Sequence, residues 1–178
     1  AFVFEKPEEG WSGLINESAI LMASNRGSGD FFGYSVAIDM DLIAVGARGE
    51  DEVSAQAGTV YVFEKPEDGW SGALEEDAKL NPGIVGSGPT YLGHSVDVQG
   101  NVVVAGGLLG TVNGVTQIGR VNVYVEPATG WSGTLTETAA LAASDGQTSD
   151  RLGVSVAISG STIAVGAYQE EAPGSNNN

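Results

Sequence analysis

The sequence predicts an all-β fold, a β-propeller of four-stranded antiparallel blades, and three observations carry this prediction. A unit of about sixty residues recurs along the chain. Each unit contains short β-branched runs bounded by turn residues, which is the pattern of strands. Glycine is also unusually frequent, at 27 of 178 residues, and this favours many tight turns between short strands.

Three motifs recur in the same order in every copy of the unit. The first reads Pro-x-x-Gly-Trp-Ser-Gly and contains Trp11, Trp70 and Trp131. The second has a glycine and a serine two residues apart, and the third adds one further glycine. These structural repeat positions are Gly33, Ser35, Gly46, Gly93, Ser95, Gly106, Gly153, Ser155 and Gly166. Several motifs at a single period indicate one duplicated supersecondary unit.

Each unit is predicted to form four strands. The first two are apolar and glycine-rich, and a link as short as 39–41 between them makes a tight antiparallel hairpin. The third alternates in a way that indicates one buried face. The fourth is polar and suits an outer edge, which needs protection against edge pairing. The expected ranges are 34–38, 42–47, 59–63 and 74–80, with copies at 94–98, 102–107, 120–124 and 135–141, at 154–158 and 162–167, and at 2–4 and 15–21.

These strands predict a repeated antiparallel meander over one repeat region, 1–178. The first strand of each unit is expected to lie innermost, because crowding near a central axis requires small residues. Four-stranded sheets arranged radially form a propeller, and the rival architecture is a β-solenoid, whose coils are usually shorter than this unit. The predicted parts are a half-blade at 1–22, blades at 31–80 and 91–141, and a half-blade at 151–178.

Three units do not close a ring of roughly four to eight blades. The preferred explanation is that the chain is a piece of a longer propeller. The alternatives are two chains in a six-bladed ring, or chains joined end to end. In both alternatives the chain self-associates through its split blade.

Composition excludes several classes of protein. The chain has 23 acidic and 7 basic residues and a net charge of −16, so it repels nucleic acid and anionic membranes. Solubility is the preferred explanation of this charge, ahead of divalent-cation binding or a saline habitat. The absence of cysteine excludes disulfides, thiol catalysis and zinc–thiolate sites. No apolar run reaches the length of about 20 residues that membrane insertion requires.

The motifs around Phe32-Gly33 and Val45-Gly46-Ala47 resemble the FG-GAP repeats of integrin α-subunits and of bacterial surface proteins. The middle copy departs from the pattern, because it has Gly106-Gly107 in place of Gly-Ala. The resemblance implies an extracellular or cell-surface protein in adhesion or recognition, with a protein or glycan partner. Many members also carry a calcium loop between the first two strands, but the three-residue links here are too short to wrap the ion. No cofactor is therefore predicted, and calcium stays open only at other loops.

The loop formed by Glu50, Asp51 and Glu52 is the remaining candidate for a cation site. Its counterpart is Glu170-Glu171, whereas the middle copy has no acidic residue at 109–119. A repeated functional loop would keep its charge, so a solvated loop is the preferred interpretation.

Aromatic side chains are the candidates for ligand binding. Trp11, Trp70 and Trp131 would suit the apolar faces of sugars, although packing of each ring on its own turn is the simpler interpretation. Asp30 and Asp150 are expected to bond nearby backbone N–H groups and so fix their loops.

No catalytic residue is predicted. His94 is the only histidine, and its counterparts are Tyr34 and Val154, which argues against catalysis or metal binding. The leading hypothesis is therefore a non-catalytic extracellular recognition or adhesion module. The alternatives are a structural subunit of a surface layer or filament and a carbohydrate-binding lectin, and an enzyme ranks last.

Overall fold

The structure is a computed structural model that describes residues 1–83, 89–111 and 115–168. All the regular secondary structure within these ranges is β-strand, so the all-β prediction is confirmed. In the described part of the chain no helix is long and apolar enough to cross a membrane. The strands are β1 Phe2–Val3, β2 Ala19–Met22, β3 Phe32–Asp39, β4 Leu42–Ala47, β5 Thr59–Glu64, β6 Gly72–Glu75, β7 Ala78–Asn81, β8 Leu92–Gln99, β9 Val102–Gly107, β10 Arg120–Val125, β11 Gly133–Thr136, β12 Ala139–Leu141, β13 Leu152–Ser159 and β14 Thr162–Ala167.

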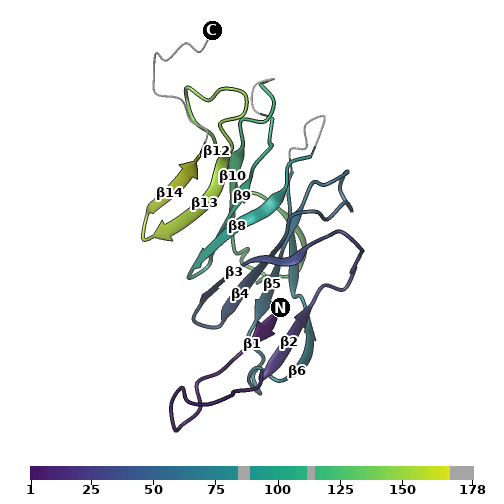
Figure 1. Cartoon of the computed structure of the whole chain (residues 1–178), viewed down its shortest axis with the longest axis vertical. Helices are drawn as coiled ribbons and strands as arrows, with labels where there is room; N and C mark the ends of the chain where they lie inside the picture. Colours follow the sequence, from purple (N-terminus) through teal and green to yellow (C-terminus); the bar gives the residue numbers. More distant parts are fainter. Residues whose placement is uncertain (84–88, 112–114, 169–178) are drawn as a thin grey trace.

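The strands form four sheets, which follow one another along the long axis of the molecule (Figure 1). The first sheet has the order β1-β2-β6, and the second has the order β11-β7-β5-β4-β3. The third sheet is β12-β10-β9-β8, and the fourth is β13-β14. The repeats of the sequence thus become successive sheets.

The first two strands of each repeat form a hairpin, as predicted. In the second sheet Ile38 pairs with Ile43 and Asp39 pairs with Leu42, so the turn holds only residues 40 and 41. Met40 has a positive φ of 51° there, where the later copies have glycine at Gly100 and Gly160. All of β4 is buried, because sheet neighbours and packing surround it on every side.

The prediction of one fourth strand per repeat is wrong. The range predicted as 74–80 is divided into β6 and β7, and 135–141 is divided into β11 and β12. Only β7 and β12 join the sheet of their own repeat. β6 and β11 cross to the preceding sheet and pair there in parallel, with Gly133 opposite Ala78 and Leu135 opposite Leu80.

This crossing strand protects the outer edge of the sheet before it. An unpaired edge strand exposes a row of N–H and C=O groups, and β11 covers that row on β7. The Pro-x-x-Gly-Trp-Ser-Gly motif makes the crossing. Its turn is closed by the N–H of Gly130, which donates to the carbonyl oxygen of Pro127 at 2.9 Å.

The inner strands β3, β8 and β13 lie next to one another, and the glycine and serine motifs form the contact between them. The hydroxyl of Ser35 donates to the carbonyl oxygen of Gly93 at 2.7 Å. A Cβ atom on Gly46 would lie 2.2 Å from that same oxygen, so only glycine permits this approach. Ser95 and Gly106 make the same contacts with Gly153 in the next sheet. The motif residues therefore set the spacing between sheets.

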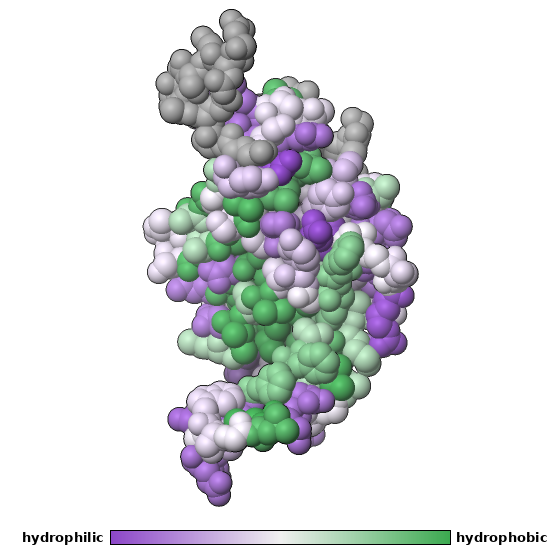
Figure 2. Space-filling model, viewed as in Figure 1, coloured by the Kyte–Doolittle hydropathy of each residue, from purple (hydrophilic) through white to green (hydrophobic). Residues whose placement is uncertain are grey.

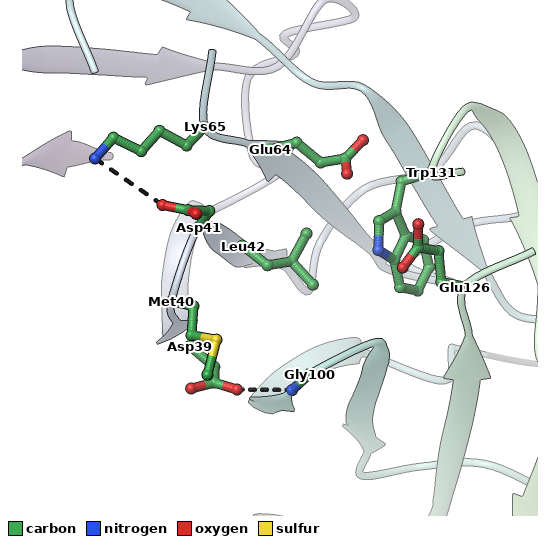
Figure 3. A pocket seen from close by; sticks show the side chains of 9 residues that line it. All are labelled: Asp39, Met40, Asp41, Leu42, Glu64, Lys65, Gly100, Glu126 and Trp131. Atoms are coloured by element: carbon green, nitrogen blue, oxygen red, sulfur yellow. Dashed lines mark hydrogen bonds and ion pairs between the residues drawn. The ribbon is translucent and has the colours of Figure 1, made fainter. Parts of the chain in front are cut away.

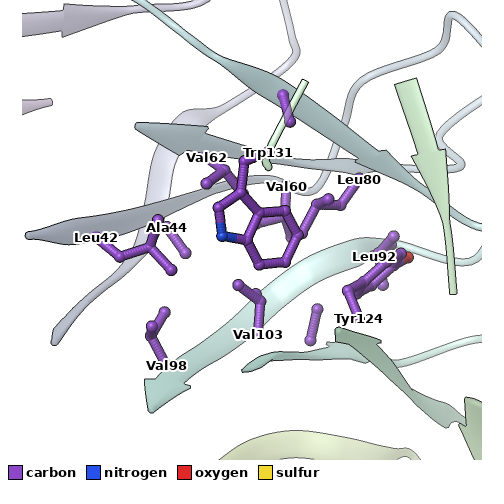
Figure 4. Close-up of a cluster of buried hydrophobic side chains, with 12 residues drawn as sticks. Leu42, Ala44, Val60, Val62, Leu80, Leu92, Val98, Val103, Tyr124 and Trp131 are labelled. Carbon is purple, nitrogen blue, oxygen red and sulfur yellow. The ribbon is translucent and has the colours of Figure 1, made fainter. Parts of the chain in front are cut away.

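The hydrophobic core lies between the sheets. One cluster fills the space between the second and third sheets, with Trp131 among the side chains of Val60, Leu80 and Val103 (Figure 4). A second cluster joins the first sheet to the second and contains Trp70. Residues of neighbouring repeats therefore share each core cluster, as expected for stacked repeats.

One apolar face is left open. Val36 and Ile38 on β3 are exposed next to β1, and Figure 2 shows apolar side chains gathered over these strands. The described first sheet has no counterpart of β3 and β4 to cover them.

Candidate binding site at the bulges of the inner strands

Each inner strand begins with a bulge, where its pairing with the next strand shifts register. In β3 the register shifts between Phe32 and Ser35, and Phe31 and Gly33 both have positive φ, of 56° and 89°. A bulge of this kind re-aims the side chains around it. The bulge recurs in β8 and β13, where Tyr91 and Arg151 have positive φ at the position of Phe31.

The bulge side chains differ from repeat to repeat although the backbone is the same. Three positions contribute: the residue two before the motif glycine, the residue after that glycine, and the residue that follows the second strand. They hold Phe31, Tyr34 and Arg48 in one repeat, Tyr91, His94 and Leu108 in the next, and Arg151, Val154 and Tyr168 in the last. A constant scaffold with variable side chains is typical of a binding surface.

Arg48 lies among three aromatic side chains from two neighbouring repeats. Its Cζ atom is 4.2 Å from the ring centroid of Tyr34, 5.3 Å from that of Phe31 and 5.6 Å from that of Tyr91. These separations are those of cation–π contacts. The rings of Phe31 and Tyr34 remain 57% and 45% exposed, so the cluster faces solvent.

His94 packs against the ring of Tyr34. The ring centroids are 4.9 Å apart and the planes are inclined by 44°. Burial lowers the pKa of His94, and the charge of Arg48 lowers it further. The imidazole is therefore neutral at neutral pH and serves as a packing surface for Tyr34.

Trp70 and Trp131 are not placed as open platforms for sugars. Their exposed fractions are 5% and 3%, because the crossing segment inserts each ring against the preceding sheet. They do not pack only on their own turns either, which the sequence had favoured. Trp11 is 60% exposed, since the described chain has no sheet before the first one. The three tryptophans thus occupy equivalent positions. Within the described residues, two of them pack against a preceding sheet.

In the acidic loop, Glu50 is turned into the protein and is used by the fold. Glu50 is 3% exposed, and its carboxylate accepts hydrogen bonds from Thr59, Asn25 and the N–H of Glu52. Burial raises the pKa of Glu50, and the bonds from Thr59 and Glu52 oppose that rise. The preferred interpretation of a solvated loop is therefore wrong for Glu50, although Asp51 is exposed. Glu170 and Glu171 lie outside the described residues.

A second acidic region lies at the opposite end of the sheets, around a cavity of 310 Å³ (Figure 3). Its wall includes Asp39, Asp41, Glu64 and Glu126, with Trp131 on one side. Asp39 is already used, because it accepts the N–H of Gly100 at 2.6 Å and ties two hairpins together. Among residues 1–83, 89–111 and 115–168, no group of three or more acidic or histidine side chains is placed to hold a metal ion.

The loops before the inner strands are fixed as predicted. Asp30 accepts a hydrogen bond from the N–H of Gly27, and Asp150 accepts one from the N–H of Gln147. The middle copy has Thr90 instead, whose hydroxyl donates to the carbonyl oxygen of Ala57. These three residues therefore serve the scaffold.

Sequence reasoning missed the cluster around Arg48. The pattern of Tyr34, His94 and Val154 indicates only that this position tolerates change, and it does not point to Phe31, Tyr91 or Arg48. The available signal was the contrast between an invariant glycine and the variable bulky residues on both sides of it.

Comparison with known proteins agrees with the motifs. The family model described as FG-GAP repeat matches residues 15–63 and 135–178, together more than half of the chain. The comparison with curated proteins finds no match. Among solved structures, the crystal structure of the computationally designed Ika4 protein is similar at 14% identity and a TM-score of 0.35, over 89% of this chain and 96% of that one. On the strength of the sequence match, this chain belongs to the FG-GAP repeat family.

Proposed function

We propose that the chain is a non-catalytic recognition module, which binds its partner at the bulges of the inner strands. The observation that carries this proposal is the cluster of Phe31, Tyr34, Arg48 and Tyr91. It joins exposed aromatic rings to one cation on a backbone that is the same in each repeat. Aromatic and arginine side chains are the types most enriched at binding sites.

We further propose that the four sheets form an arc of a β-propeller. Neighbouring sheets meet through the same contact, from Ser35 to Gly93 and again from Ser95 to Gly153. A repeated contact between inner strands is what a radial arrangement of blades requires. In such a ring the bulges would gather at one end of the axis and form a common surface.

A catalytic function has less support. The cluster contains no serine, cysteine or carboxylate that could act as a nucleophile or as a paired acid and base. An extracellular or cell-surface location, with a protein or glycan partner, is proposed on the family resemblance alone.

A glycan and matrix-protein array probed with labelled protein tests the recognition function. We expect binding to a defined subset of ligands, and loss of that binding in the double variant Tyr34→Ser, Tyr91→Ser. Leu14→Ser is the control, since Leu14 is an exposed apolar side chain outside the cluster. Binding that survives in the double variant would contradict this site.

A second function, as a structural building block, is favoured by the open face on the first sheet. A groove of 260 Å³ lies between β1 and β3 and is lined by Phe2, Phe4, Val36, Ile38 and other apolar side chains. A strand like β4 would fill this groove. β14 has nearly the same sequence as β4, and its outer edge has no partner among the described strands. We propose that β14 of a second copy pairs with β1.

The pairing of β4 with β5 predicts the register of this joint. Val45 lies opposite Tyr61, and the counterparts of these residues are Val165 and Phe2. A mixture of Phe2→Cys and Val165→Cys proteins should therefore form a mixed disulfide on oxidation, because the chain has no cysteine of its own. Each variant alone is the control. A chain that stays monomeric at all concentrations, with no mixed disulfide, would rule the joint out.

A further inference from the structure

Arg48 is a cation for which the described protein supplies no anion or hydrogen-bond acceptor. Within the described residues, its guanidinium makes cation–π contacts with three aromatic rings. Nε is buried without a partner, whereas the terminal nitrogens are not among the buried atoms. The chain carries 23 acidic residues, yet none lies within ion-pair distance of this guanidinium in the described structure. An arginine with five donors and no acceptor is prepared for an acceptor from outside.

The aromatic rings hold the guanidinium in place. Tyr34 lies closest to the guanidinium, at 4.2 Å, and its ring also contacts that of His94, with the ring centroids 4.9 Å apart. Phe31 itself has a positive φ of 56° at the bulge, a conformation that a residue other than glycine keeps only where the surrounding structure holds it. A fixed guanidinium loses little entropy on binding and presents its N–H groups in a defined direction.

A comparison with Arg151 sets Arg48 apart. Arg151 occupies the bulge position of the last repeat and also packs on an aromatic ring, that of Tyr168, at 5.2 Å. Its guanidinium, however, donates a hydrogen bond to the hydroxyl of Tyr168. Stacking on a ring therefore does not by itself leave an arginine without an acceptor.

We propose that the cluster binds the carboxylate of an acidic sugar, a uronic acid residue of a glycan. The planar fork of a guanidinium matches a carboxylate in two parallel hydrogen bonds. Phe31 and Tyr34 keep 57% and 45% of their surface exposed beside the fork, and exposed aromatic surface suits the apolar C–H face of a sugar ring. The inference rests on the proposed recognition function and names the ligand class of that same site.

The overall charge narrows the ligand further. At a net charge of −16 the protein repels densely charged polyanions such as nucleic acid or heavily sulfated chains. One isolated carboxylate on an otherwise neutral, ring-shaped body meets a single cation without that long-range repulsion. An acidic peptide would supply the carboxylate but not a rigid C–H face for the rings.

Isothermal titration with glucuronosyl-xylotriose, which carries one carboxylate, with neutral xylotriose and with the peptide acetyl-Gly-Glu-Gly-amide, which also carries one, separates the alternatives. We expect glucuronosyl-xylotriose to bind at least about tenfold more tightly than the other two. Arg48→Gln should remove this preference, and Arg48→Lys should restore only part of it, because an ammonium keeps the charge but not the fork. Arg26→Gln is the matched control, since Arg26 is exposed, lies outside the cluster and donates a hydrogen bond to the sulfur of Met22.

Circular dichroism and the melting temperature establish that each variant is folded, and Tyr34→Leu provides a second, uncharged change at the site. Equal binding of the neutral sugar, unaffected by Arg48→Gln but lost in Tyr34→Leu, would overturn this inference and leave the recognition function standing. Preference for the peptide through Arg48 would overturn the sugar class. Absence of binding to all three ligands by the folded protein would overturn the inference as well, while the array decides the recognition function separately.

Discussion

The hydroxyl of Ser35 donates a hydrogen bond to the carbonyl oxygen of Gly93 in the neighbouring sheet, at 2.7 Å. The two residues are 58 positions apart in the chain, so this bond ties one repeat directly to the next. Ser95 makes the same bond to Gly153. The corresponding hydroxyl of Ser155 has no further described sheet to meet.

Replacement of Ser35 should weaken the contact between sheets. We expect Ser35→Ala to lower the free energy of unfolding by about 1 kcal/mol, the usual net contribution of one such hydrogen bond. Urea unfolding measures the change. Ser155→Ala is the control that this chain supplies, and it should be nearly neutral. Equal losses in both variants would show that the serine acts within its own strand instead.

Replacement of Trp131 should likewise destabilise the fold more than replacement of Trp11. Trp131→Ala removes a large buried side chain between two sheets, and we expect a loss of about 3–5 kcal/mol. Trp11→Ala changes an exposed ring and should cost only about 0.5 kcal/mol. Urea unfolding followed by circular dichroism compares the two. A similar cost at both positions would contradict the role of the crossing segment.

Stability should depend on pH through Glu50. Burial raises its pKa in the folded protein above the unfolded value, so the folded state holds this proton more tightly. The contribution to stability is present below the unfolded pKa of about 4.3 and is lost as the pH rises through the folded pKa.

Glu50→Gln should therefore flatten the pH dependence of unfolding between pH 4 and neutrality. The amide can still be accommodated, because the hydroxyl of Thr59 can turn its hydrogen to the side-chain oxygen of Asn81, 2.8 Å away. Urea unfolding at several pH values measures the slope, and Asp51→Asn, at an exposed neighbour, is the control. An unchanged slope in Glu50→Gln would show that other groups cause the dependence.

The turn at Met40 should tolerate glycine better than methionine. Met40 has a φ of 51°, where the later copies have glycine. Relief of this left-handed conformation should exceed the extra unfolded-state entropy of glycine, so we expect Met40→Gly to gain about 0.5–1 kcal/mol. Gly160→Met is the reciprocal variant and should lose a similar amount, since no atom lies near its Cβ position. Thermal melting checks both, and a destabilised Met40→Gly would refute the argument.

The strands and their hairpins could be predicted from the sequence because their signals are local. Alternation, β-branched residues and short turn links placed 42–47 and 102–107 as β4 and β9, with the same bounds in the structure. The repeat itself also identified the positions that need glycine, such as Gly46. Strands, hairpin turns and glycine positions depend on residues close together in the chain, so the local sequence pattern is enough to predict them.

The long-range arrangement depended on the tertiary structure. The sequence did not show that residues 133–136 would pair with β7 of another repeat, because edge protection is satisfied by any strand that reaches the edge. It also did not show that Glu50 would be buried, nor that Phe31, Tyr34, Arg48 and Tyr91 would converge. The sequence by itself determined the repeating unit and its strands. Only the tertiary structure decided which sheet each crossing strand joins and which side chains meet, since both result from packing between units far apart in the chain.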